Sequence, residues 1–124
     1  MTISKGFLII GAVYLVIGMS LGIWMGANEA FTLAPVHAHI NLVGFTLMTL
    51  FGLAYRVIPA LNTTLWGRLH FWLFQIGGLV LLVSLYLLVS QTLPGATIGP
   101  VLAISEMVVL AGVVAFLFNL FKSA

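Results

Sequence analysis

Residues 34–56 of the chain read APVHAHINLVGFTLMTLFGLAYR, a long apolar segment that carries His37 and His39 near its start. The segment is long enough for a helix that crosses the hydrocarbon core of a bilayer, about 30 Å thick. Ionisable side chains are costly there and usually have partners or a function. The H-x-H pair is therefore the first candidate for a functional site, and the alternative is that each histidine only hydrogen-bonds a neighbour or interfacial water.

The spacing of the pair restricts what it can bind. Each residue of an α-helix advances about 100°, so His37 and His39 point about 200° apart. One regular helix cannot bring both imidazoles to a single metal ion. If both bind metal, they bind two different centres. Asn41 and Gly44 fall on the His37 side of this helix, and Thr46 falls on the His39 side.

The whole chain has the composition of an integral membrane protein. Of its 124 residues, 63% are hydrophobic and 5% are charged, and the mean hydropathy is +1.29. The sequence contains no cysteine, which excludes disulfides, thiolate metal sites and the covalent attachment of c-type haem. A net charge of +2 is too small for a surface that binds nucleic acid.

Four apolar segments are long enough to span a bilayer. We expect an all-α fold in which residues 1–124 form a single transmembrane bundle, with spans at about residues 6–25, 36–55, 71–90 and 97–121. The first span carries Gly18, Gly22 and Gly26 at a four-residue spacing that lets another helix approach closely. Pro35 suits the first turn of the second helix.

The basic residues all fall on one side of this four-span arrangement. They are Lys5, Arg56, Arg68 and Lys122. Because positive charge favours the cytoplasmic side, we expect an integral protein of a bacterial inner membrane with both termini in the cytoplasm. His37 and His39 then lie near the outer face.

Two further ionisable residues lie in or beside the apolar segments. His70 opens the third span on the basic side, too far from the H-x-H pair to share a metal ion, and we interpret it as an interfacial residue. Glu106 lies about nine residues into the fourth span, which places it about 13 Å deep, near the middle of the bilayer. A carboxyl at this depth is either a proton relay or polar contact, or a protonated group bonded to its own helix.

Two motifs in this order resemble subunit I of the haem–copper oxidases and nitric oxide reductases. VHAHINLVGFTLMTLFGLAYRVIP is similar to the tenth helix of that family, and LHFWLFQIGG is similar to the start of the eleventh. TIGPVLAISEMVVLAGVVAFLFNL resembles the twelfth helix more loosely. The resemblance covers residues 35–120, at most four helices against the family's twelve, and it implies one arc of helices like those in subunit I.

The resemblance also implies a cofactor. In that family the two histidines of the H-x-H pair ligate two different haems, and the matching positions here are His37 and His39. Non-covalent haem b is thus the implied cofactor, and Asn41, Thr46 and Glu106 are candidate polar supports. The family's copper-ligating histidines, histidine-linked tyrosine and acidic proton channels have no counterpart in this sequence. Oxygen reduction at copper and proton pumping are therefore not implied.

A single chain cannot enclose a haem between imidazoles that point apart, so we expect a homo-oligomer. In a closed ring His37 of one subunit faces His39 of the next, and the pseudo-threefold family favours a homotrimer with three haems. Two imidazoles saturate the iron, which predicts an electron-transfer cytochrome b rather than a complete oxidase. Quinol or another respiratory protein is the expected partner in the lipid bilayer.

Two alternatives to electron transport belong to other classes. One is a haem-free helix-packing subunit or an assembly factor of a respiratory complex, which would dock through its glycine faces. The other is the handling of copper or another metal by the outer histidines, which is disfavoured because a copper site would favour methionine or cysteine neighbours.

Overall fold

The computed structural model describes residues 2–123, which form helices joined by short turns. The first span is α1 (Ile3–Asn28). The second span runs through η1 (Phe31–Leu33), α2 (Ala34–His39), the π-helical η2 (Ile40–Leu47) and α3 (Met48–Val57). The 3-10 helix η3 (Pro59–Thr63) then leads to α4 (Leu65–Val89), which is followed by α5 (Gly95–Ser123).

Within residues 2–123, four helical stretches are long and apolar enough to cross a membrane. They are α1, the continuous stretch Phe31–Val57, α4 and α5, with 26, 27, 25 and 29 residues. This result confirms the predicted all-helical fold with four apolar helices, and each helix is longer than the predicted span. The chain has the composition and helix lengths of an integral membrane protein.

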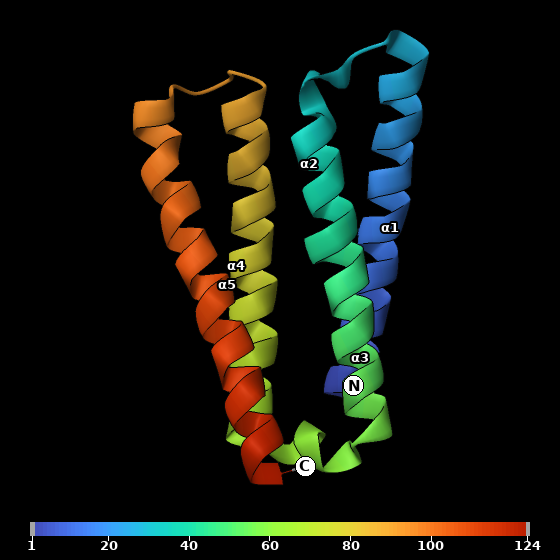
Figure 1. Cartoon of the computed structure of the whole chain (residues 1–124), viewed down its shortest axis with the longest axis vertical. Helices are drawn as coiled ribbons and strands as arrows, with labels where there is room; N and C mark the ends of the chain where they lie inside the picture. The colour runs from blue at the N-terminus through green and yellow to red at the C-terminus, as the bar shows by residue number, and fades with distance from the viewer. Residues whose placement is uncertain (1, 124) are drawn as a thin grey trace.

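The helices form two hairpins that lie side by side (Figure 1). One hairpin pairs α1 with the second span, and the other pairs α4 with α5. Both chain termini lie at the end where η3 joins the hairpins (Figure 1). The four basic residues belong to the helix ends at this same end of the molecule, which we call the basic end: Lys5, Arg56, Arg68 and Lys122.

Local signals set the ends of the helices. The Thr2 hydroxyl accepts a hydrogen bond from the Lys5 N–H at 3.1 Å and caps α1. The Thr64 hydroxyl caps α4 in the same way, with the Gly67 N–H at 2.9 Å. Pro35 lies in the first turn of α2, as predicted.

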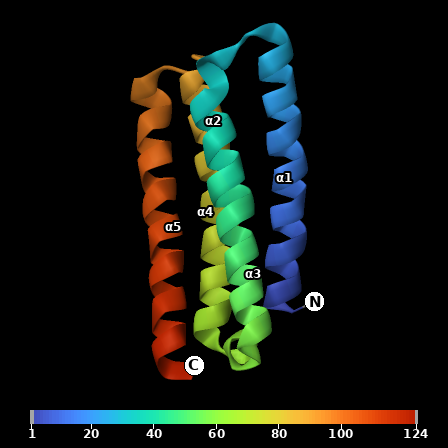
Figure 2. The ribbon, with the colours of Figure 1, turned by 45° about the vertical axis from the view of Figure 1, so that its right-hand side comes forward.

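Two hydrophobic clusters join the hairpins. The cluster at the basic end contains Phe7, Met48, Phe51, Tyr55, Leu61 and Phe74. The cluster at the opposite end contains Val36, Ile40, Leu81 and Leu82. In Figure 2 the helices stand in the order α5, α4, second span and α1. In the most apolar part of each span, no more than 33% of the residues are buried inside the chain. Most of the surface of each span is therefore left for lipid or another protein.

Glycines bring α1 and the second span into close contact. A Cβ atom at Gly18 would clash with the Asn41 amide, and a Cβ atom at Gly44 would lie 2.6 Å from Cγ of Tyr14. Gly26, the last glycine of the four-residue series, has no such neighbour within 4 Å. Two glycines of α1 and two of the second span therefore provide the closest approach, and the helix that approaches belongs to the same chain: Gly18, Gly22, Gly44 and Gly52.

This packing predicts a difference between two matched substitutions. Gly44→Ala places a methyl group against Tyr14, and we expect it to lower the unfolding free energy by about 1–3 kcal/mol. Gly26→Ala adds the same methyl group in open space and should leave stability unchanged or raise it. Thermal unfolding of both variants in detergent, followed by circular dichroism, checks this. Equal losses in the two variants would contradict the predicted packing.

Candidate functional site

The histidine pair lies in α2, at the end of the molecule opposite the basic end. Because α2 is α-helical through His39, the two side chains diverge as predicted. The His37 side chain is half-buried, whereas the His39 side chain is exposed. The two imidazoles therefore occupy different environments.

His37 is held inside the chain, against α1. Its Nδ1 atom lies 2.9 Å from the carbonyl oxygen of Gly18, and its Nε2 atom lies 3.3 Å from the amide nitrogen of Asn41. A carbonyl oxygen only accepts, so Nδ1 carries the proton and donates to Gly18, while Nε2 accepts from Asn41. Gly22 lies beside the ring, where a Cβ atom would be 2.7 Å from Cε1. Both ring nitrogens of His37 thus have partners in the same chain.

His39 has one nitrogen engaged and one free. Its Nδ1 atom donates to the carbonyl oxygen of Pro35 at 2.7 Å, so the lone pair lies on Nε2. In the part of the chain that the structure describes, Nε2 has no hydrogen-bond partner. An imidazole whose Nδ1 is tied to a carbonyl, with Nε2 free, has the arrangement of a metal-ligating histidine. Thr46 is one of the predicted polar supports, whereas Pro35 is not predicted; every residue inside a helix has a carbonyl four residues earlier, so the spacing alone gives no signal for Pro35.

The π-helical segment η2 follows the histidine pair directly. In it, the Thr46 hydroxyl donates to the carbonyl oxygen of Asn41, five residues earlier, at 3.0 Å. Thr46 therefore supports the backbone rather than the His39 ring. The Asn41 Oδ1 atom is buried and lacks a hydrogen-bond partner among residues 2–123. A π-helical segment beside a buried polar group is a feature often found at functional sites.

Glu106 lies near the middle of α5, and its side chain is exposed on the surface of the chain. Among the described residues it forms neither a hydrogen bond nor an ion pair. The same residues contain no group of three or more histidine and acidic side chains that could hold a metal ion. Within residues 2–123, Glu106 therefore does not group with the histidine pair.

The interpretation of His70 as an interfacial residue is wrong. The Thr64 cap starts α4 at Leu65, so His70 lies inside the helix and its side chain is completely buried. Its Nδ1 atom lies 2.9 Å from the Tyr55 hydroxyl, and its Nε2 atom has no hydrogen-bond partner within residues 2–123. Three aromatic rings lie against the imidazole, with centroids 4.4–4.9 Å away: Phe7, Phe51 and Phe116.

Comparisons of the chain with protein-family models, curated proteins and solved structures find no match. The resemblance to subunit I of the haem–copper oxidases stays a prediction from two sequence motifs. The function of the protein is therefore inferred from the geometry of its own residues.

The different environments of the two histidines predict different effects on stability. In haem-free protein, His37→Ala removes the hydrogen bonds to Gly18 and Asn41, and we expect a loss of about 1–3 kcal/mol of unfolding free energy. His39→Ala removes one exposed contact, and we expect a change within about 0.5 kcal/mol. Thermal unfolding in detergent measures both changes. A larger loss for His39→Ala would contradict the assignment of His37 to the packed interface.

Proposed function

We propose that the protein is a membrane-embedded b-type cytochrome in which His39 ligates haem iron at an interface between copies of the chain. The observation that carries this proposal is the His39 ring, which is exposed, tied through Nδ1 to the Pro35 carbonyl at 2.7 Å, and free at Nε2. The hydrogen bond to Pro35 fixes the tautomer whose Nε2 lone pair can bind a metal. The H-x-H motif and its family resemblance support the same assignment.

The two histidines differ in how readily each could bind haem iron. His37 could keep its Nδ1 hydrogen bond to the Gly18 carbonyl as a ligand, but its Nε2 atom would first have to leave the Asn41 amide, and its ring is packed against α1. The ring in which His37 of one subunit faces His39 of the next needs this rearrangement at every site. A twofold contact whose axis passes beside His39 needs none, because it brings this surface residue from both copies together. We therefore favour a site in which the His39 side chains of two copies would hold the iron, with one haem per two chains.

The proposed role is electron transfer within a membrane. Haem iron with two imidazole ligands exchanges one electron and has no open position for oxygen. The chain itself would supply the ligand and fix its orientation through the Pro35 carbonyl. Quinol or another respiratory protein is the proposed redox partner. The basic residues gathered at one end favour cytoplasmic termini, which places His39 toward the outer face.

A haem-free packing subunit or assembly factor is the second candidate. Both ring nitrogens of His37 have hydrogen-bond partners within the chain. This favours the second candidate, because this histidine already has a structural role. The large unburied surface of the four spans and the exposed Glu106 carboxyl also fit a chain that docks onto another membrane protein.

Absorption spectroscopy of protein purified in detergent, after expression with haem supplied, separates the two candidates. We expect a Soret band and a low-spin, six-coordinate spectrum in the wild type. His39→Ala should lose this spectrum because it removes the ligand, and His37→Gln should keep it. Native mass spectrometry should find one haem per two chains.

The other outcomes of this experiment are equally informative. A wild-type protein without a Soret band would favour the haem-free role. Loss of the spectrum in both variants, with three haems in a trimer, would favour the ring that uses His37 and His39. A His39→Ala protein that keeps a six-coordinate haem would contradict the proposed ligand.

A further inference from the structure

Arg68 lies near the start of α4, at the basic end, and apolar grooves open on both sides of it. Its side chain is exposed. The groove between α4 and α5 has a volume of about 220 Å³. Besides Arg68, its lining is apolar and consists of Leu69, Trp72, Leu73, Ile76 and Val108.

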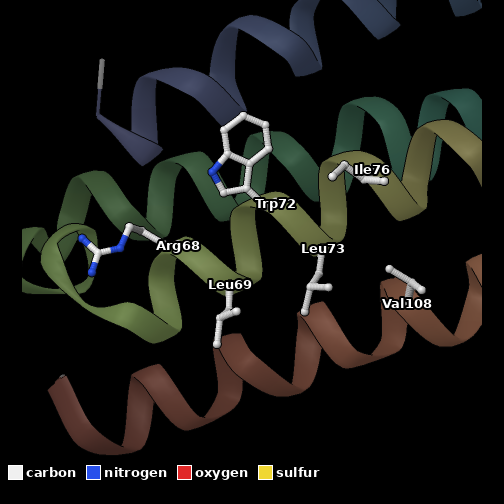
Figure 3. A pocket seen from close by; sticks show the side chains of 6 residues that line it. All are labelled: Arg68, Leu69, Trp72, Leu73, Ile76 and Val108. Atoms are coloured by element: carbon white, nitrogen blue, oxygen red, sulfur yellow. The ribbon is translucent and has the colours of Figure 1, made fainter.

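Figure 3 shows how these side chains are distributed around α4. Leu69 and Leu73 point toward α5, and Trp72 points toward the side of α1. Arg68 points away from the groove, past the start of α4 (Figure 3). The cation therefore lies beyond the end of the groove, and the hydrophobic side chains lie along it.

Trp72 also lines a second groove, on the opposite side of α4. This groove lies between α1 and α4, has a volume of about 490 Å³ and begins at the same Arg68 side chain. Ile10 and Phe71 form part of its largely apolar wall, which also contains the polar residues Thr2 and Gln75. The α4/α5 groove continues in the other direction, because Ile76 and Val108 also line the next hollow along these two helices. Arg68 is thus the common end of two apolar paths that Trp72 separates.

Within residues 2–123, the Arg68 guanidinium has no anionic partner. The sequence contains two acidic residues, Glu29 and Glu106; the first lies at the opposite end and the second near the middle of α5. No hydrogen bond or ion pair engages the guanidinium within residues 2–123. At the end of a transmembrane helix, arginine and tryptophan lie at the level of the lipid headgroups.

We propose that Arg68 and the two grooves bind one anionic diacyl phospholipid. The guanidinium binds the headgroup phosphate through paired hydrogen bonds. One acyl chain follows the α1/α4 groove and the other follows the α4/α5 groove, on either side of Trp72. A quinol supplies neither the negative charge nor two chains, and a zwitterionic lipid supplies no net charge. The site lies at the end of the molecule opposite His39 and does not depend on haem.

Native mass spectrometry of the detergent-purified protein, titrated with defined lipids, tests the proposal. The probes are dioleoyl phosphatidylglycerol, dioleoyl phosphatidylcholine and the single-chain lysophosphatidylglycerol. We expect the diacyl anionic lipid to bind about fivefold or more tightly than the zwitterionic lipid, as one basic residue contributes about that factor. It should also bind more tightly than its single-chain counterpart.

Matched variants assign the effect to this site. Arg68→Gln should lower the affinity for phosphatidylglycerol about fivefold. Arg56→Gln makes the same change of charge at the same end, in an exposed residue that lines neither groove, and should change the affinity little. Val108→Phe narrows the α4/α5 groove, so it should lower the affinity for the diacyl lipid more than the affinity for the single-chain lipid.

Three results would overturn the proposal. The first is equal binding of phosphatidylglycerol and phosphatidylcholine. The second is an equal loss of affinity for phosphatidylglycerol in Arg68→Gln and Arg56→Gln, which would indicate attraction to the charge of the whole basic end. The third is displacement of bound phosphatidylglycerol by a short-chain quinol from the wild type and Arg68→Gln alike, which would assign the grooves to a neutral ligand.

Discussion

The hydrogen bond from His37 Nδ1 to the Gly18 carbonyl fixes the rotation of the second span against α1. It forms because Gly22 leaves space for the imidazole between the two helices, while Gly18 leaves space for the Asn41 amide. Once His37 faces α1, the helix geometry turns His39 to the outside of the chain. The exposed position of His39 and the half-buried position of His37 are therefore two consequences of one contact.

Polar contacts join neighbouring helices at both ends of the apolar bundle. Near the outer histidines, His37 joins α1 to α2. At the basic end, Tyr55 joins α3 to α4 through His70, and the Thr64 hydroxyl donates to Asn119 of α5 at 2.7 Å. Such bonds are costly to break in a medium without water. The chain thus keeps a defined shape although little of its apolar surface is buried, and each end is left with an exposed group, His39 or Arg68.

Much of the architecture could be predicted from the sequence, because a helix that crosses a lipid bilayer must be long and apolar. Long apolar runs define four spans, and the positions of basic residues place both termini at one end. The angle between His37 and His39 follows from helix geometry alone. Periodicity fixes only this relative angle, however, and the side that faces α1 is decided by which surface carries glycine and Asn41.

Other features depend on contacts that the sequence pattern does not show. His70 was misplaced because the apolar run begins after it, whereas the helix begins at the Thr64 cap. That difference moves the imidazole from the interface into an aromatic cluster. The hydrogen bond from His39 to Pro35 and the π-helical turn at Thr46 are likewise set by backbone geometry. The two grooves beside Arg68 arise from the packing of α4 between α1 and α5.

Chemical modification of the histidines tests most directly whether His37 faces inward and His39 outward. Diethyl pyrocarbonate reacts with accessible ring nitrogens that carry a lone pair, and mass spectrometry locates each modified residue. In haem-free protein, His39 should react rapidly at Nε2, while His37 and His70 should react much more slowly because they lack an accessible lone pair. Modification of His37 as fast as that of His39 would contradict the inward orientation, and with it the choice of His39 as the ligand.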